Sequence, residues 1–159
     1  MRVPAFVIWP GKVRPGSKSD QMAMNIDLLP TVLTAAGLPL PSDRLIDGRD
    51  IAPMLAGKAS TPHDHLFYVT MWTGEYEAVR GKDYKYRDRV QKPATNQFYP
   101  AASPLGSFAE PALYDLNRDN ESHDVTLKHP QIAADLKATL QTFRESLASN
   151  PRGWLPEGR

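Results

Sequence analysis

The sequence of 159 residues predicts the α/β class, and α+β for this segment taken by itself: the end of a sheet domain, followed by a small antiparallel sheet packed with a C-terminal helix. Three patterns lead to this prediction. Residues 3–9 form a nearly continuous apolar run, which is typical of a strand buried on both faces of an α/β sheet. Residues 76–87 alternate around a glycine-containing turn, which predicts an antiparallel hairpin. Residues 130–147 carry apolar side chains at helical spacing, which predicts an amphipathic helix that covers the small sheet.

The segment 25–37 is the first after the apolar run to show helical periodicity. Asp27 is placed to cap this helix, because a carboxylate accepts hydrogen bonds from the free N–H groups of the first turn. Pro30 then falls in the first turn, where its missing N–H costs nothing. Gly37 is the expected left-handed stop. Because the segment is so apolar, we expect this helix to be buried against a larger part of the protein.

Residues 39–62 are mostly irregular, with one helical turn expected near 51–55. Asp47 and Asp50 allow two interpretations, a pair of catalytic carboxylates or a turn in which Asp50 caps the short helix. We adopt the capped turn. His63 and His65 stand at the spacing of two ligands on one strand, but no third or fourth ligand lies near them in sequence. A metal site and an exposed loop leading into a strand both remain open, and the loop is favoured.

Residues 66–72 are rich in β-branched and aromatic side chains and predict a strand. In the hairpin that follows, Tyr84 and Tyr86 should face one side, and Lys85 and Arg87 the other. Six basic residues cluster here: Arg80, Lys82, Lys85, Arg87, Arg89 and Lys92. This cluster is compatible with nucleic-acid binding, with a solvated strand face or with contact to an anionic substrate. Interrupting aspartates and a formal net charge of +1 favour the solvated face.

The last part of the chain begins with a long loop, residues 91–111, which is either a pocket rim or a variable insertion. Residues 112–116 predict a further strand. Residues 115–120 resemble the start of an EF-hand loop, but Asn120 replaces the required glycine and Thr126 the bidentate glutamate, so no calcium site is expected. The final helix should stop at Asn150, and residues 151–159 should form a tail.

Composition excludes several classes of site. The sequence contains no cysteine, which removes disulfides, zinc–thiolate sites and a cysteine nucleophile. The near-neutral charge gives no reason to expect nucleic acid or an anionic membrane as partner. No apolar run reaches the ~20 residues of a membrane helix, and the run up to Trp9 is too short for a signal peptide. No targeting segment is therefore expected, and the compartment stays undetermined.

Several stretches occur together in a recognisable order: RVPAFVIWPGKV, NIDLLPTVLTAAGLPLP, DGRDIAPMLAG, AVRGKDYKY and ALYDLNRDNES. This series resembles the formylglycine-dependent sulfatases, the arylsulfatases of the alkaline-phosphatase-like superfamily, over residues 2–147. It resembles only the last third of such an enzyme. The resemblance implies three parts: residues 1–60 end the catalytic α/β domain, 61–150 form a small C-terminal subdomain, and 151–159 are a tail.

The resemblance also implies where the chemistry lies. The formylglycine, made from a cysteine or serine, and the calcium ligands belong to the part of the family that precedes this segment. None of them can be transferred to a position here, and no serine is followed by the required Pro-x-Arg pattern. We therefore expect no catalytic residue, no metal ligand and no cofactor in this chain. By itself it is predicted to be inactive.

The function expected from this resemblance is that of a C-terminal segment of a sulfuric ester hydrolase, which supplies scaffold and part of the substrate-pocket rim. One alternative is a non-catalytic carbohydrate-binding, anion-binding or interaction module derived from a sulfatase, with Trp72, Glu75 and Tyr76 as a sugar- or aryl-contacting loop. These residues could equally serve packing. Another alternative is a fragment of a phosphate or phosphonate ester hydrolase. A sulfate ester is expected as partner only within a full-length enzyme. The N-terminal strand would lack its neighbouring strands, so we expect its edges and faces to be exposed, with either disorder there or self-association through it.

Overall fold

The structure is a computed structural model that describes residues 3–69, 76–88, 110–118 and 121–150. The chain divides between Asp64 and His65 into two compact units. The first contains residues up to 64, and the second runs from 65 to 151. The predicted domain limits at residues 60 and 150 stay predictions, because a compact unit need not be a domain that folds alone.

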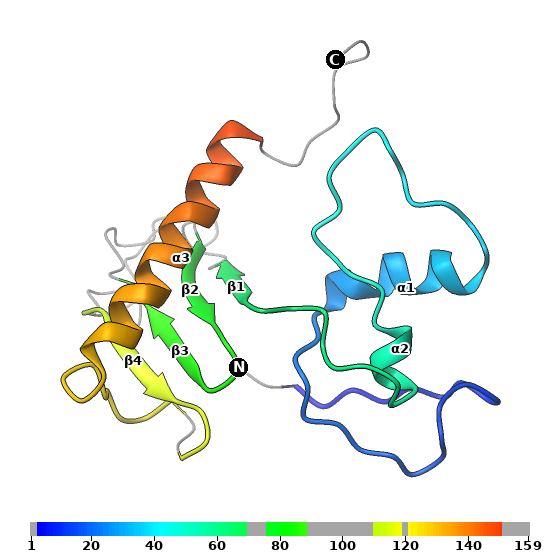
Figure 1. Cartoon of the computed structure of the whole chain (residues 1–159), viewed down its shortest axis with the longest axis horizontal. Coiled ribbons are helices and arrows are strands. Elements are labelled where there is room, and N and C mark those ends of the chain that lie inside the picture. The colour runs from blue at the N-terminus through cyan, green and yellow to red at the C-terminus, as the bar shows by residue number, and fades with distance from the viewer. Residues whose placement is uncertain (1–2, 70–75, 89–109, 119–120, 151–159) are drawn as a thin grey trace, which may run out of the picture. The chain divides into compact units, whose positions relative to one another are not determined.

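The first unit contains three short helical elements (Figure 1). These are the 3₁₀ helix η1 (Asn25–Asp27), α1 (Leu28–Ala35) and α2 (Ala52–Leu55). Gly37 has φ +70° and Leu38 N donates to Leu33 O at 2.9 Å, which confirms the predicted left-handed stop. Asp50 Oδ1 accepts a hydrogen bond from Ala52 N at 2.9 Å, which confirms the capped turn.

Two predictions about apolar segments in the first unit are wrong. Residues 3–9 form no strand, although the exposure expected for this segment is present, with Phe6 and Ile8 each 92% exposed. A strand needs a neighbour for its N–H and C=O groups, and no described residue supplies one. The apolar side chains of α1 are not buried either, since Leu28 and Val32 are mostly exposed. Helical spacing identified the helix correctly, but it cannot say whether a covering surface exists within the chain.

The second unit is built on a four-stranded antiparallel sheet with strand order β1-β2-β3-β4 (Figure 1). Its strands are Leu66–Val69, Tyr76–Arg80, Tyr84–Arg87 and Ala112–Asp115. The predicted hairpin is present as β2 and β3, closed by a hydrogen bond from Gly81 N to Tyr84 O at 2.9 Å. Consecutive strands pair in sequence order, so the sheet is a simple meander.

Helix α3 (Pro130–Ser149) covers one face of this sheet, as Figure 1 shows. The predicted apolar stripe forms the core: Leu136 and Leu140 are buried with Ala133 against Val79, Tyr86 and Leu113. Phe143 extends this contact by stacking on Phe67, with ring centroids 3.8 Å apart. The helix is therefore held by a continuous row of apolar contacts, as its periodicity predicts.

The outer edge of β4 is covered by the chain segment before α3. Val125 N donates to Leu113 O at 2.8 Å, and Leu113 N donates to Asp124 Oδ1 at 3.0 Å. Burial alone would raise the pKa of Asp124, but hydrogen bonds from Thr126 and from the Leu113 amide outweigh it and hold the pKa below its ordinary value. These contacts satisfy an edge that would otherwise be open to pairing.

Among the described residues, no helix is both long and apolar enough to cross a lipid bilayer.

Candidate functional site

The sheet face opposite α3 is unusually rich in charge and aromatic rings. The strand register places its side chains in two rows. Tyr68, Ala78 and Arg87 follow one another in the first row. Arg80, Lys85 and Tyr114 follow one another in the second. We call this surface the outer face. The sequence predicted correctly that Lys85 and Arg87 share it and that Tyr84 and Tyr86 pack on the other side.

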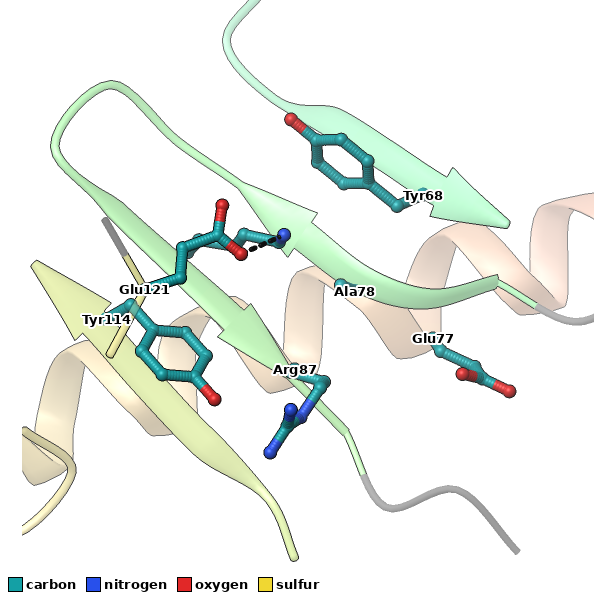
Figure 2. A pocket seen from close by; sticks show the side chains of 7 residues that line it. Tyr68, Glu77, Ala78, Arg87, Tyr114 and Glu121 are labelled. Carbon is teal, nitrogen blue, oxygen red and sulfur yellow. Dashed lines mark hydrogen bonds and ion pairs between the residues drawn. The ribbon is translucent and has the colours of Figure 1, made fainter. Parts of the chain in front are cut away.

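The outer face contains a hollow of about 220 Å³ (Figure 2). Ala78 lies at its base because this small residue is flanked in the register by the much larger Tyr68 and Arg87. The tyrosine rings of β1 and β4 lie at its two sides (Figure 2). The residues that line it are Tyr68, Glu77, Ala78, Lys85, Arg87, Tyr114 and Glu121.

Lys85 is largely neutralised within the hollow. Its Nζ lies 2.5 Å from Glu121 Oε2 and 4.7 Å from the centre of the Tyr68 ring. Burial by itself would raise the pKa of Glu121, but the hydrogen bond and charge of Lys85 outweigh it, so the pKa is lowered. The lowered pKa keeps the Glu121 carboxylate ionised at neutral pH, and Lys85 Nζ is held against the face of the Tyr68 ring.

Arg87 keeps part of its hydrogen-bonding capacity. Its guanidinium carbon lies 5.6 Å from the centre of the Tyr114 ring, and Nη2 donates to Glu110 O at 3.3 Å. The Nε of Arg87 is buried and has no hydrogen-bond partner among the described residues. The Nε of Arg80 is in the same condition. A buried N–H without an acceptor is costly, and both of these groups lie on the outer face.

The predicted sugar-contacting loop cannot be placed as a whole, because Trp72 and Glu75 lie outside the described residues. Tyr76 begins β2, and its ring meets Phe143 edge-on at 5.0 Å between centroids. This contact belongs to the packing of α3. Arg89, Lys92 and most of the 91–111 loop also lie outside the described residues. A role of Trp72, Glu75 and Tyr76 in substrate contact therefore stays a prediction.

A second polar cluster joins α3 to the end of the hairpin. Arg144 donates to Asp88 Oδ2 at 2.6 Å and to Tyr76 O at 2.9 Å, and the Tyr86 hydroxyl lies 3.3 Å from Asp88 Oδ1. Burial, followed by the charge and hydrogen bond of Asp88, raises the pKa of Tyr86 to about 12. Sequence periodicity did not reveal this cluster, because Arg144 bonds to residues that lie 56 and 68 positions before it in the chain.

Asp27 does not cap the first turn of α1 as predicted, although its side chain forms the capping-box bond of the preceding η1. It is fully buried and its side chain makes no capping bond to α1. Instead, Met24 N donates to Oδ2 at 2.7 Å and Arg49 N donates to Oδ1 at 2.8 Å. His63 Nε2 lies 2.8 Å from the same Oδ1. His63 does stand in a loop that leads into β1, as expected, but its side chain is only 9% exposed, so the expected exposure is wrong. Asp27 therefore joins three segments that are far apart in sequence.

Gly48 allows this junction to close. A Cβ atom at this position would lie 2.1 Å from the carbonyl oxygen of Ile26, far inside contact distance. Thr31 supports the same junction: its hydroxyl donates to Asp27 O at 2.6 Å and accepts from Ile51 N at 3.0 Å. We call Asp27, Thr31, Arg49 and His63, with the backbone that they bind, the Asp27 junction. Its bonds are mostly to backbone amides, which is typical of a structural support.

The described residues contain no group of three His, Asp or Glu side chains arranged to hold a metal ion. His63 is engaged by Asp27, and the ring of His65 lies 6.5 Å from that of Phe67. In the segment that resembles an EF-hand, Asp115 Oδ1 accepts a bond from Asn117 N at 3.0 Å, which is a turn contact. Asp115 thus serves a turn.

The small sheet with one long helix and the unit containing the Asp27 junction together define a sulfatase C-terminal domain, as comparison with known proteins shows. Residues 1–146 match the family described as N-sulphoglucosamine sulphohydrolase, C-terminal. The chain belongs to this family. The C-terminal sulfatase segment predicted from the sequence motifs is thereby confirmed.

Curated relatives are sulfatases. Human arylsulfatase A is 36% identical over 131 residues, which cover 75% of this chain and 25% of that protein. The steryl-sulfatase of Rattus norvegicus is 28% identical over an alignment of 170 positions, gaps included, that covers 95% of this chain and 30% of that protein. The chain thus spans between a quarter and a third of the length of these relatives.

Solved structures confirm the predicted fold class. A structure from a study of the metabolism of multiple glycosaminoglycans by Bacteroides thetaiotaomicron has a TM-score of 0.65 and 27% identity, and the match covers 86% of this chain and 28% of that one. A sulfatase from Pseudoalteromonas sp. has a TM-score of 0.70 over 91% of this chain and 30% of that one, at 20% identity. The latter likeness shows the fold alone.

Proposed function

We propose that this chain acts as the C-terminal domain of a sulfuric ester hydrolase, where it provides scaffold and part of the substrate-pocket rim. The observation that carries the proposal is the family match over residues 1–146. The curated relatives support it, since those quoted above are arylsulfatase and steryl-sulfatase. A phosphate or phosphonate ester hydrolase is less well supported, because these relatives are sulfatases.

Catalysis of this type needs an activated nucleophile and a metal ion or cation cluster to stabilise developing charge. The residues of this chain do not fit a formylglycine or its calcium ion. The sequence has no cysteine and no serine in the required Pro-x-Arg context. Its described carboxylates are bound to backbone amides, arginine, lysine or histidine rather than converging on a common point. The nucleophile and the metal ligands are assigned to the N-terminal part of the complete enzyme.

The contribution of this chain is then positional. The Asp27 junction fixes the path of residues 24–63, and α3 fixes the sheet that leads to the loop between β1 and β2. Trp72 and Glu75 fall between β1 and β2 in sequence and Tyr76 begins β2, and we assign these three residues to substrate contact at the pocket rim. Rigid support of a loop by a packed scaffold is how binding residues are commonly presented.

The proposal is tested by assaying the 159-residue chain with an aryl sulfate and an aryl phosphate, with and without calcium. We expect no hydrolysis above buffer and no stoichiometric calcium binding by titration calorimetry. Multiple turnovers that a point substitution in this chain abolishes would show that it contains a catalytic site and would refute the assignment.

A further inference from the structure

We propose that Arg144 of α3 is a positioning residue for the pocket rim, and that it acts by fixing the end of the sheet to which the rim residues are attached. The inference rests on the proposed function, because it concerns the same rim of Trp72, Glu75 and Tyr76. It adds a residue that acts on the substrate through others. Two features carry it: the direction of the strands and the bonds of one guanidinium group.

The meander brings two connections to one end of the sheet. Val69 pairs with Tyr76 where the chain passes from β1 to β2. Arg87 pairs with Ala112 where it passes from β3 to β4. Since β2 and β3 are antiparallel, both connections start and finish at the same end of the sheet, and the tight turn at Gly81 lies at the other end. We call the end that carries the two connections the rim end.

Arg144 binds two strands at the rim end at once. Its Nε donates to the carbonyl oxygen of Tyr76 at 2.9 Å, where β2 begins. Its Nη1 donates to Asp88 Oδ2 at 2.6 Å, directly after β3. A planar guanidinium holds two acceptors at a fixed spacing, whereas the ammonium of a lysine is a single point charge. The two strands are also joined here by the bond from Asp88 N to Glu77 O at 2.8 Å, so Arg144 ties α3 to a fixed pair.

Tyr76 is held by α3 through its main chain and through its ring. Less than a third of either side chain in the pair of Arg144 and Asp88 is exposed, so water competes little for these bonds. Phe143, the neighbour of Arg144 on α3, meets the Tyr76 ring edge-on at 5.0 Å between centroids. A contact residue that is fixed before the ligand arrives lowers the cost of binding. Arg144 therefore contributes to affinity for the substrate rather than to the chemical step.

The test uses a chimera in which residues 1–150 of this chain follow the catalytic part of human arylsulfatase A. Arg144→Met removes both bonds, and Arg144→Lys keeps a positive charge beside Asp88 without the bond to Tyr76 O. We expect both variants to raise KM for an aryl sulfate roughly fivefold, with kcat within about twofold of the native chimera. Lys137→Met removes a charge from the exposed face of α3 and should leave both constants unchanged.

The lysine variant separates positioning from stability. Its melting temperature should stay close to that of the native chimera, because the pairing with Asp88 persists, while its KM stays raised. A KM that recovers together with the melting temperature would reduce Arg144 to a structural role and overturn the proposal, as would an unchanged KM in Arg144→Met. If Arg144→Met fails to fold by circular dichroism, Arg144→Lys decides.

An inactive native chimera would count against the proposed function, and NMR of the 159-residue chain then tests Arg144 separately. The Tyr76 carbonyl shares a peptide group with the Glu77 N–H, so the Glu77 ¹⁵N signal and the Tyr76 ring signals report its position. We expect both to shift in the two Arg144 variants, while the methyl signals of buried Leu140 stay in place. Unchanged signals of Glu77 and Tyr76, or equal shifts at Leu140, would overturn the proposal.

Discussion

Replacement of Asp27 by alanine should disrupt the first unit far more than an ordinary helix-cap mutation would. The substitution removes the acceptor of Met24 N, Arg49 N and His63 Nε2 from a fully buried position. Each donor left without a partner costs about 1–3 kcal/mol. Allowing for water that enters the space, we expect a loss of at least about 3 kcal/mol in the free energy of opening this unit.

Amide hydrogen exchange measures this loss locally. The Ile51 amide is the best reporter, because its acceptor is the Thr31 hydroxyl and the substitution does not remove it. Since ~1.4 kcal/mol corresponds to a factor of ten, its protection should fall at least about 100-fold. Asp50→Ala is the control: it removes a single bond to Ala52 N and should cost about 1 kcal/mol. If Asp27→Ala lowered protection no more than Asp50→Ala does, the account of the Asp27 junction would be refuted.

Leu140→Asp should lower the stability of the second unit by about 3 kcal/mol or more, because a charge enters the core under α3. The control Ala138→Asp changes an exposed residue of the same helix and should leave the melting temperature unchanged. An unchanged melting temperature in Leu140→Asp would show that the helix is not docked. Gly48→Ala should lower the stability of the first unit by about 1–3 kcal/mol, because the new Cβ clashes with Ile26 O. Amide hydrogen exchange in this unit should become faster, and an unchanged exchange rate would contradict the prediction. The pKa of Tyr86 is raised to about 12, so the stability that its neutral phenol contributes is fully present below the unfolded pKa of ~10 and is lost as the pH rises to about 12. Over this pH window the free energy of unfolding, measured with denaturant, should therefore fall more in the wild type than in Tyr86→Phe. Equal pH dependence in the two proteins would contradict the raised pKa. Exposed Phe6 should promote self-association, so Phe6→Ser should shift sedimentation towards monomer, and a wild-type chain that is already monomeric would count against this.

The features that the sequence predicts correctly are governed by near neighbours along the chain. The hairpin follows from the turn at Gly81 and from alternation on either side of it, and the core stripe of α3 follows from spacing within one helix. The stop at Gly37 is likewise local, because it depends on one left-handed residue. The family motifs added the sulfatase assignment, which local patterns alone do not provide.

The features that the sequence missed depend on partners distant in sequence. From the sequence, Asp27 is predicted only as a helix cap. Its two principal contacts, Arg49 N and His63, lie 22 and 36 residues away, too far along the chain for a local pattern to reveal them. The pairing of Lys85 with Glu121 also spans 36 residues, so the hollow could not be assembled from the basic cluster alone. The N-terminal run reads as a buried strand, yet a strand forms only where a neighbouring strand exists.

The assignment as a C-terminal sulfatase domain is tested most directly by a chimera. Residues of this chain that match human arylsulfatase A replace the corresponding 25% of that enzyme, and aryl-sulfate hydrolysis is measured for the chimera and for the 159-residue chain alone. We predict turnover by the chimera, loss of that turnover when Asp27→Ala is introduced, and no turnover by the isolated chain. A correctly folded chimera without activity, or an isolated chain with it, would contradict the role proposed for this domain.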